Sequence, residues 1–348
     1  MILLKRKSRV VVGVPTRLTA VSPHSGHGRV WSEVLDRLSQ MTDLVVGTDK
    51  AADVWLDNGH DPDPAIDGPV VACAYEVSWG TPELDAEFPP ETLQKLSVAT
   101  EQAMARATQV VTGAQTSKKQ LLEYYGLPPE RVHVYPFGVD HELFHPRRAP
   151  KGRALVRERT GDDRPYLIFT SAISPRKNLH AVRGALQGLA DGGFPHALVI
   201  VAADPPGDFD LDELRRQAFA ELPGHPGRIL RFSDPSDEEL ASLVAGATAA
   251  CQPSRFEGFG LPVLEAMASG IPVVVANRAA LPEVVGQAGW IVEPTAEGVE
   301  QALLEIIEDP ALAHRMGAKA RRRAESFTWD RTAKGWLHVL RATARERR

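Results

Sequence analysis

The sequence predicts an α/β protein built on parallel sheets, and three observations support this fold class. Short apolar runs alternate with amphipathic segments along almost the whole chain. The apolar runs are hydrophobic throughout, as expected for strands that helices cover on both faces. The chain has 348 residues, more than one hydrophobic core usually covers, so we expect two domains.

The first half of the chain contains six strand candidates separated by helical patterns. The apolar runs that predict strands are Val10–Val14, Leu44–Val46, Val54–Leu56, Val70–Ala74, Gln109–Thr112 and Val132–Tyr135. The amphipathic segments between them predict helices at Val30–Leu38, Leu93–Ala107 and Ser117–Tyr125.

The second half repeats this arrangement and then ends in helices. Its predicted strands are Leu167–Ser171, Ala197–Ala202, Ile229–Phe232, Ala249–Pro253, Pro272–Ala276 and Trp290–Val292. Its predicted helices are Leu179–Leu189, Leu211–Leu222, Asp237–Ala247, Pro262–Ser269, Glu297–Glu308, Leu312–Ser326 and Trp329–Arg345.

The segment His145–Pro165 is predicted to be a linker between the two domains. It is charged, contains three prolines and lacks an apolar strand. Two α/β domains joined in this way would form a cleft between two sets of strand carboxyl ends, where such folds bind ligands.

The composition excludes several classes of protein. Hydrophobic residues make up 43% and charged residues 24%, which excludes a disordered chain. The formal net charge of −5 argues against nucleic acid as the main partner. Cys73 and Cys251 lie in apolar runs and are expected to be reduced core residues of a cytoplasmic protein. We expect neither a signal peptide nor a membrane-spanning segment, because the apolar stretches are too short.

The stretch Pro253–Gly270, PSRFEGFGLPVLEAMASG, leads from a strand through a glycine loop into a helix. Pro262 stands where the helix would begin, a position that proline favours. A helix start presents free backbone N–H groups to an anion. Glu257 and Glu265 add carboxylates, which are strong acceptors for sugar hydroxyls. On its own, the stretch fits a turn with two surface glutamates equally well.

Two adjacent cations follow the first strand of the second half. Arg176 and Lys177 occur in SAISPRKNL, on the way into the next helix. A planar guanidinium and a point charge at this place suit a diphosphate. The alternative is an ordinary pair of solvated basic residues.

Together these motifs resemble the retaining glycosyltransferases of family GT4, which have the GT-B fold. The resemblance covers most of the chain and includes PRKNL, PSRFEGFGLPVLEAMASGIPVVVAN, LPEVVGQAGWIVEP and FTWDRTA in the family's order. In the first half, SGHGRVWSEVLDRL and TSKKQLLEYYGLPPERVHVYPFGVDHELFHP are also similar to family segments. The fold implied is two Rossmann-like parallel-sheet domains facing a central cleft.

The resemblance also implies that the two domains bind different substrates. Residues 1–148 would form an acceptor-binding domain and residues 149–329 a domain binding the nucleotide-sugar donor. The last helix, about 330–348, would pack back on the first domain.

For the donor, the resemblance implies that Arg176 and Lys177 bind the diphosphate, Glu257 the sugar hydroxyls and Glu265 the ribose. Backbone N–H groups would approach the sugar and phosphate from Gly258, Phe259, Gly260 and Leu261. Gly26 and Gly28 would let the backbone of the first domain approach the phosphate and the acceptor.

One departure from the family concerns a His-Asp pair that many members carry after the strand corresponding to Val70–Ala74. This chain has Tyr75 and Glu76 there. We expect a functional role for one of the two, without deciding which, and the alternative is that both only pack. A second departure is Phe137, where the family often has Asn.

Three other patterns are set aside. HELFH, His141–His145, matches a zinc motif, which needs a stable helix and a third ligand further on, but here Pro146 follows directly and the segment lies at the domain linker. Gly26-x-Gly28 is an incomplete dinucleotide fingerprint. The acidic loop Asp57–Asp67 is interpreted as solvated and not as a metal site.

We therefore expect a retaining, metal-independent hexosyltransferase without a cofactor. We favour mannose as the sugar and GDP as the nucleotide, and leave the acceptor open between a glycan, a small metabolite and a lipid-linked molecule. Peripheral membrane contact also stays open. The alternatives are an epimerase or hydrolase of the same fold, or a non-catalytic protein that binds sugar nucleotides; a dehydrogenase ranks last.

Overall fold

In the computed structural model the described residues are 9–21, 26–75, 77, 90–202 and 210–346. The chain divides into two compact units, and the division falls between Gly138 and Val139. The second unit takes Val139–Phe327, and the chain returns to the first unit at Thr328. The boundary expected after residue 148 therefore lies inside the second unit.

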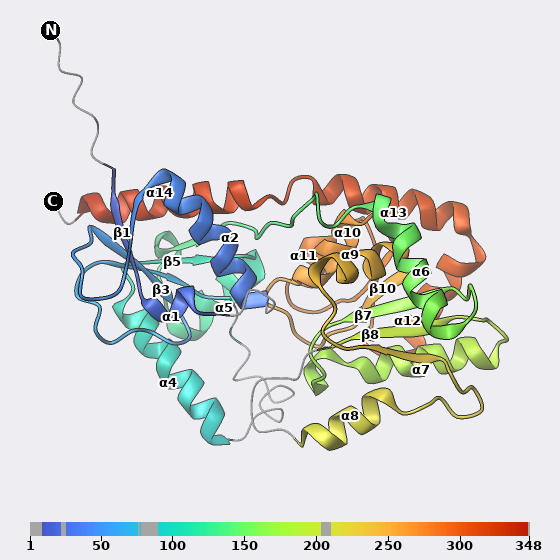
Figure 1. Ribbon diagram of the computed structural model, residues 1–348. Coiled ribbons are helices and arrows are strands. Elements are labelled where there is room, and N and C mark those ends of the chain that lie inside the picture. Colours follow the sequence, from blue (N-terminus) through green and yellow to red (C-terminus); the bar gives the residue numbers. More distant parts are fainter. Residues whose placement is uncertain (1–8, 22–25, 76, 78–89, 203–209, 347–348) are drawn as a thin grey trace, which may run out of the picture. The chain divides into compact units, whose positions relative to one another are not determined.

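The first unit is built on a six-stranded parallel sheet in the order β2-β1-β3-β4-β5-β6 (Figure 1). Its strands match the predicted apolar runs closely. Their bounds are Val11–Val14 (β1), Asp43–Val46 (β2), Val54–Asn58 (β3), Val70–Cys73 (β4), Gln109–Thr112 (β5) and Val132–Val134 (β6). The strand order reverses between β1 and β3, so this is the topological switch point of the sheet.

The helices of the first unit include one from the far end of the chain. α14 packs in this unit, where its Trp336 ring lies 5.9 Å from that of Trp31 on α2. The hydroxyl of Thr332 donates 2.7 Å to the carbonyl of Pro136. The helix bounds are Thr16–Thr19 (α1), Gly26–Met41 (α2), Pro90–Arg106 (α4), Gln115–Tyr125 (α5) and Trp329–Glu346 (α14).

The second unit contains another six-stranded parallel sheet, in the order β12-β11-β10-β7-β8-β9. Its switch point lies between the neighbouring strands β7 and β10, which are far apart in the sequence. The bounds are Tyr166–Thr170 (β7), Ala197–Val201 (β8), Ile229–Phe232 (β9), Ala249–Gln252 (β10), Val273–Ala276 (β11) and Trp290–Val292 (β12).

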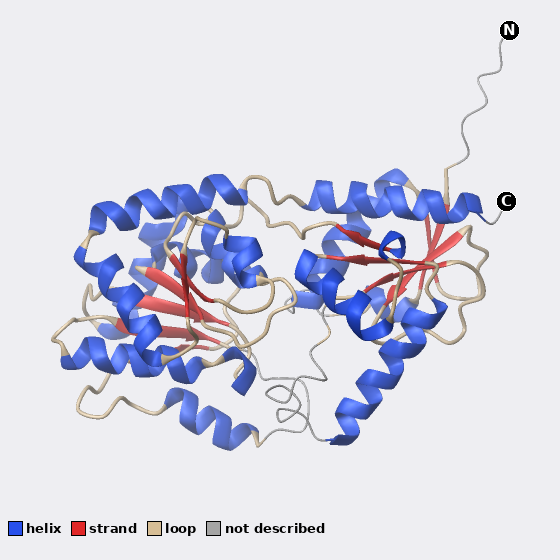
Figure 2. Ribbon diagram, turned by 180° about the vertical axis from the view of Figure 1, so that it is seen from behind, coloured by secondary structure: helices blue, strands red, loops and turns tan. Residues whose placement is uncertain are grey.

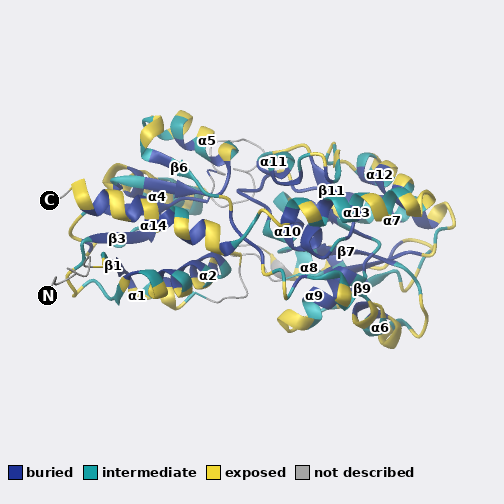
Figure 3. Cartoon of the chain, turned by 90° about the horizontal axis from the view of Figure 1, so that it is seen from above, coloured by how far each residue is buried: buried dark blue, intermediate teal, exposed yellow. Residues whose placement is uncertain are grey.

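Helices cover both faces of each sheet (Figure 2). In the second unit they are Ala149–Thr160 (α6), Leu179–Asp191 (α7), Leu211–Phe219 (α8), Asp237–Gly246 (α9), Leu261–Ala268 (α10), Leu281–Val285 (α11), Ala296–Glu308 (α12) and Pro310–Ala324 (α13). The strands are largely buried and the exposed residues lie mostly on helices and loops (Figure 3).

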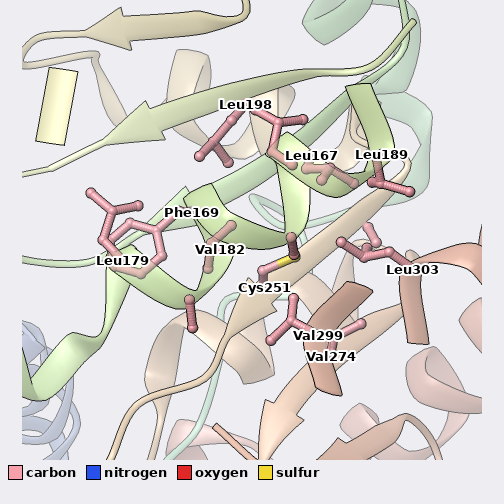
Figure 4. Close-up of a cluster of buried hydrophobic side chains, with 14 of the residues drawn as sticks. Leu167, Phe169, Leu179, Val182, Leu189, Leu198, Cys251, Val274, Val299 and Leu303 are labelled. Atoms are coloured by element: carbon pink, nitrogen blue, oxygen red, sulfur yellow. The ribbon is translucent and has the colours of Figure 1, made fainter. Parts of the chain in front are cut away.

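One face of the second sheet packs on α7 and α12 through a continuous apolar cluster (Figure 4). Leu167 and Phe169 of β7 contribute from the sheet, Val182 from α7 and Leu303 from α12. Each of these side chains is completely buried. Burial of such a side chain stabilises by about 1.5–3 kcal/mol, so this cluster fixes β7 and β10 as a rigid base for the loops that follow them.

The predicted linker His145–Pro165 is wrong, because most of it forms α6. Pro146 and Pro150 stand in the first positions of a 3₁₀ turn and of α6, where a missing N–H costs nothing. Gly161, in the left-handed conformation, ends the helix. Gly152 lets α6 approach α9, since a Cβ there would lie 1.8 Å from the carbonyl oxygen of Ser242.

Candidate functional site

The candidate site lies at the switch point of the second sheet. The segments Ser171–Leu179 and Pro253–Gly260 leave the carboxyl ends of β7 and β10, which are adjacent strands. The two segments are joined by a backbone hydrogen bond of 2.8 Å from the N–H of Arg255 to the carbonyl of Arg176. Open α/β sheets bind ligands at such a switch point, so this is the place where a site is expected.

Arg176 and Lys177 are presented by a 3₁₀ turn, Pro175–Lys177, that ends at Asn178. Asn178 has φ 56°, in the left-handed region that asparagine tolerates better than most residues. Its buried side-chain amide donates to the carbonyls of Pro253, at 3.0 Å, and Pro294, at 2.8 Å. Asn178 thus fixes the turn against the loop that follows β10.

Glu257 forms the centre of the site and pairs with both cations. The ammonium group of Lys177 lies 2.8 Å from each carboxylate oxygen of Glu257. The guanidinium of Arg176 lies 3.9 Å from Oε2 of Glu257 and donates 3.0 Å to the carbonyl of Phe256. The structure therefore brings together three of the predicted site residues, from segments about 80 residues apart.

The carboxyl group of Glu257 is held in its charged form. Burial opposes ionisation, because the residue is 6% exposed. The positive charges of Lys177 and Arg176 outweigh this cost, with the hydrogen bonds from Lys177 and Ser254, so the pKa of Glu257 lies below its ordinary value. Two cations thus face the single carboxylate of Glu257, so the cluster of these three side chains has an excess of positive charge.

Two residues of the site were missed by the sequence analysis. The hydroxyl of Ser254 donates 2.8 Å to Oε1 of Glu257, and the amide of Gln252 donates 3.0 Å to the same oxygen. Gln252 also donates 2.7 Å to the Ser254 hydroxyl. The only sequence signal is their polarity at the end of an apolar strand, three and five residues before Glu257.

The glycine loop completes this edge. Gly260 has φ 102°, and a Cβ there would lie 2.8 Å from a methyl group of Leu281, so the position requires glycine. Phe259 is buried and its ring packs edge-on against Phe327, with centroids 6.1 Å apart. Gly258 is buried too, and Leu261 begins α10, with Pro262 next. The chain thus turns directly from Glu257 into a helix start.

Glu265 lies on the second turn of α10 and is buried, like Glu257. Its own carbonyl accepts the N–H of Ser269 at 3.0 Å as α10 ends. Both glutamates are therefore buried, which contradicts the alternative of a turn with two surface glutamates. Burial does not assign their roles.

In the first unit, the predicted residues gather around Tyr75, at the end of β4. The ring of His27, between Gly26 and Gly28 at the start of α2, stacks on the Tyr75 ring with centroids 4.2 Å apart. His60 accepts the backbone N–H of Tyr75 at 3.0 Å. The hydroxyl of Tyr75 is buried beside the thiol of Cys73, and burial, followed by the effect of Cys73, raises its pKa. Glu76 lies outside the described residues.

Phe137, the second departure from the family, is buried in the same aromatic group. Its ring centroid lies 6.0 Å from that of Tyr75 and 6.3 Å from that of Trp329. Phe137 therefore has a packing role beside Tyr75.

The switch point of the first sheet is acidic. Arg17, which follows β1, lies 2.5 Å from a carboxylate oxygen of Asp57 and 2.5 Å from one of Asp61. A carboxylate oxygen of Asp63 lies 3.7 Å from the same guanidinium. Three carboxylates thus surround one cation, the reverse of the balance around Glu257.

The two histidines of HELFH are engaged by other groups. His141 lies 3.2 Å from the carbonyl oxygen of Phe327, and Nδ1 of His145 accepts the N–H of Arg147 at 3.1 Å. Arg321 lies 2.8 Å from the other nitrogen of His145. Across the described ranges, no group of three or more His, Cys, Asp or Glu side chains is placed to hold a metal ion.

A groove of about 560 Å³ lies elsewhere, between the end of α2 and the exposed face of α14. Its lining is mainly basic and apolar: Met41, Lys334, Leu337, His338, Arg341, Ala342 and Arg345. The groove contains none of the predicted site residues. We place the candidate site at the second sheet because the charged groups that suit a diphosphate lie there. Among the helices described, none is long and apolar enough to cross a bilayer.

Comparison with known families and curated proteins supports the sequence analysis. Residues 154–323 match the family model described as glycosyl transferases group 1. The chain is 35% identical over 230 residues to an MMP alpha-(1->4)-mannosyltransferase of Mycolicibacterium hassiacum, covering 65% of this chain and 52% of the relative. It is 33% identical over 271 residues to a D-inositol 3-phosphate glycosyltransferase of Nocardioides sp., covering 74% and 58%. The chain thus spans little more than half the length of these relatives.

Solved structures show the same fold at low sequence identity. A sucrose-phosphate synthase of Thermosynechococcus elongatus superposes with a TM-score of 0.76 at 16% identity, covering 96% of this chain and 99% of that one. Anabaena HepE in complex with UDP and glucose gives a TM-score of 0.75 at 18% identity, covering 96% and 100%. These likenesses confirm the predicted α/β fold class and its GT-B type.

Proposed function

Since residues 154–323 belong to the glycosyl transferases group 1 family, we propose that the chain is a glycosyltransferase that uses a nucleoside diphosphate sugar. It moves the sugar to a hydroxyl group of an acceptor, with retention of configuration and without a metal ion. The observation that carries this proposal is the cluster of Arg176, Lys177 and Glu257 at the switch point of the second sheet.

In this proposal the second unit binds the donor. The cluster around Glu257 holds two cations and one carboxylate, whereas the cluster around Arg17 at the first unit's switch point holds one cation and three carboxylates. A diphosphate is attracted to the former and repelled by the latter. Arg176 supplies a planar fork of donors and Lys177 a point charge. The start of α10 adds the backbone N–H groups of Gly258–Leu261.

The two glutamates take different parts of the donor. Glu257, beside the cations, accepts hydrogen bonds from hydroxyls of the sugar. Glu265, a turn into α10, accepts from the ribose. Gly26 and Gly28 let the backbone of the first unit approach the ligand, and the first unit binds the acceptor. The buried hydroxyl of Tyr75 makes Tyr75 a packing residue in this account, and the role expected at positions 75 and 76 falls to Glu76.

The chemistry follows from these groups. The bond between the sugar's anomeric carbon and the diphosphate breaks, and the acceptor oxygen bonds to that carbon from the same face. The leaving diphosphate takes the acceptor's proton. Arg176, Lys177 and the helix start stabilise the negative charge that develops on the diphosphate, which makes electrostatic stabilisation the main catalytic effect.

For the donor we favour GDP-mannose. The relative from Mycolicibacterium hassiacum and an Escherichia coli protein at 25% identity are both named mannosyltransferases, which supports a mannosyl donor here. The acceptor is a hydroxyl of a glycan, a small metabolite or a lipid-linked molecule. Both cysteines are free and buried, in keeping with the proposed location in the reducing cytoplasm.

A donor screen tests the proposal. GDP, UDP, dTDP and ADP sugars are added to the protein while heat unfolding is followed. A ligand at 100 times its Kd stabilises by about 2.7 kcal/mol, which is readily measured. The donor that stabilises is then incubated with and without candidate hydroxyl acceptors, and the products are identified.

We expect one nucleotide class to stabilise and turnover to require an acceptor. Product formed equally without any acceptor would replace the proposal with an epimerase or hydrolase. Donor binding without turnover under any condition would leave a non-catalytic sugar-nucleotide-binding protein. Absence of stabilisation by all four nucleotide classes, with NAD binding instead, would reject the proposal altogether.

A further inference from the structure

The two oxygens of the Glu257 carboxylate have different surroundings. Oε1 accepts hydrogen bonds from two neutral donors, Ser254 at 2.8 Å and Gln252 at 3.0 Å, in addition to Lys177. Oε2 faces cations: Lys177 lies at 2.8 Å and Arg176 at 3.9 Å. The β10 end therefore helps to hold Oε1, whereas the contacts to Oε2 come from the cation pair that follows β7.

The two neutral donors form a rigid pair. Ser254 is completely buried and Gln252 is 4% exposed. The Ser254 hydroxyl accepts a hydrogen bond from Gln252 and donates one to Glu257, which fixes the direction of its O–H bond. A third, longer contact of 3.4 Å joins the Gln252 amide to the hydroxyl of Ser171, after β7. Donors locked in this way cannot turn to another partner without leaving a buried polar group unsatisfied.

The distinction matters once a phosphate group arrives. If Arg176 and Lys177 bind the diphosphate, as in the proposed function, they share their positive charge with it, and Glu257 loses part of its compensation. A buried carboxylate left without partners would take up a proton or move. Hydrogen bonds from Ser254 and Gln252 do not depend on the cations, so they can keep Oε1 fixed and the group ionised.

From this geometry we infer that Ser254 and Gln252 are positioning residues for Glu257. They hold Oε1 in place so that Oε2 is turned toward the donor when the cations engage the diphosphate. Neither touches the substrate in this arrangement, and their effect on the reaction passes through the orientation and charge of Glu257. This inference rests on the proposed function for its kinetic consequence, but not for its effect on the pKa of Glu257.

The test compares Ser254→Ala and Gln252→Met with a matched control, Ser269→Ala. Ser269 is also buried in the second unit, but its hydroxyl has no hydrogen-bond partner among the described residues. In each of the first two variants a hydrogen bond to a charged group is lost, so kcat with the sugar nucleotide should fall by about tenfold to 100-fold. Affinity for free GDP or UDP should change by less than about threefold, since neither residue touches the nucleotide. Ser269→Ala should leave both quantities unchanged.

A double variant separates a joint role from two independent ones. If Ser254 and Gln252 act through the same oxygen, Ser254→Ala/Gln252→Met should cost far less than the product of the two single effects. Multiplying effects, or an equal loss of nucleotide affinity and kcat, would show that the two residues only support the loop and would overturn the inference.

A second readout needs no substrate. The charged groups that face Glu257 are Arg176 and Lys177, both from the segment after β7. Loss of the Ser254 hydrogen bond should raise the pKa of Glu257 in the folded protein. The destabilisation caused by Ser254→Ala should therefore shrink as the pH is lowered from 7 to 4, because protonation of Glu257 removes the charge that the hydrogen bond stabilises. For Ser269→Ala the change in Tm should be the same at both pH values.

The kinetic measurement and the pH dependence of Tm distinguish a failure of the proposed function from a failure of this inference. If no donor is turned over by the wild type, the proposed function fails, and the pH dependence of Tm still decides whether Ser254 controls the charge of Glu257. If the wild type is active but Ser254→Ala lowers Tm equally at pH 7 and pH 4, the positioning role is rejected and the proposed function stands.

Discussion

The carboxyl edges of the two sheets occupy equivalent places in similar topologies, yet they carry opposite charge. At the β7–β10 edge two cations meet one buried carboxylate, Glu257. At the β1–β3 edge one cation, Arg17, meets three carboxylates. Side-chain charge, and not the fold, therefore distinguishes an edge that attracts a diphosphate from one that repels it.

Removing a cation should affect the two edges very differently. Lys177→Met leaves the buried carboxylate of Glu257 without its nearest charge, and breaking a buried ion pair in this way costs about 3–5 kcal/mol. The double variant Lys177→Met/Glu257→Gln should recover part of this loss, because the buried charge is gone. Urea unfolding at pH 7 measures both.

Arg17→Met provides the comparison at the other edge. Asp57 is buried there, but burial already raises the pKa of its carboxyl, and Arg17 is more exposed than Lys177, so the cost should be smaller. If Lys177→Met and the double variant are equally unstable, the charge of Glu257 is not what destabilises Lys177→Met. The proposed difference between the two edges would then be rejected.

The two glutamates offer a sharper view of the β10 edge. Glu257→Gln should lower kcat by about tenfold to 100-fold while affinity for the free nucleoside diphosphate stays the same or rises, since Glu257 competes for Lys177. Glu265→Gln should instead raise the donor KM and weaken nucleotide binding. Steady-state kinetics beside calorimetric titration decides between them. Reversed effects would exchange the assignments of sugar and ribose.

At the amino ends of the strands of the second sheet, a buried ionisable group without an opposite charge makes stability depend on pH. His196 precedes β8 and is buried; burial, helped by Arg228, lowers its pKa to about 4 from 6.5. Because the unfolded chain then binds more protons below pH 6.5, acidification should destabilise the fold by about 1–2 kcal/mol at pH 5. In His196→Gln this part of the pH dependence of Tm should disappear. An unchanged pH profile would show that His196 is not buried in its neutral form.

Metal removal tests the acidic edge. If cations of the protein alone neutralise the diphosphate, excess EDTA should change the rate by less than about twofold, well below the tenfold that corresponds to 1.4 kcal/mol. Complete loss of activity in EDTA, with rescue by Mg²⁺ or Mn²⁺, would instead give a catalytic role to carboxylates such as Asp57 and Asp63.

Much of the fold could be predicted because buried parallel strands leave an apolar signature in the sequence. The run Val70–Ala74 contains β4 of the first sheet, and the run Ala197–Ala202 contains β8 of the second. The helix α6 was missed because its prolines suggested a linker, although they occupy helix-start positions. Short helices such as α1 and α11 contain too few residues to show a period.

The candidate site could be predicted in part. Arg176, Lys177 and Glu257 stand in recognisable local motifs, and the structure joins them. Asn178 acts through contacts with residues 75 and 116 positions away, which no local pattern reports. Gln252 lies close to Glu257 in the sequence, but its only signal there is polarity at the end of an apolar strand. The burial of the Tyr75 hydroxyl depends on rings from other elements, so it was equally invisible in the sequence.

The central claim, that the cation pair after β7 binds the donor's diphosphate, is tested most directly by calorimetric titration of GDP and UDP. The proteins compared are the wild type, Arg176→Ala and Arg17→Ala, each first shown by heat unfolding to be folded. One of the two nucleotides should bind the wild type, and Arg176→Ala should weaken it by about 10- to 150-fold, the value of one charge-assisted hydrogen bond. Arg17→Ala should stay within about threefold of the wild type. Unchanged affinity in Arg176→Ala, or a large loss in Arg17→Ala alone, would contradict the account.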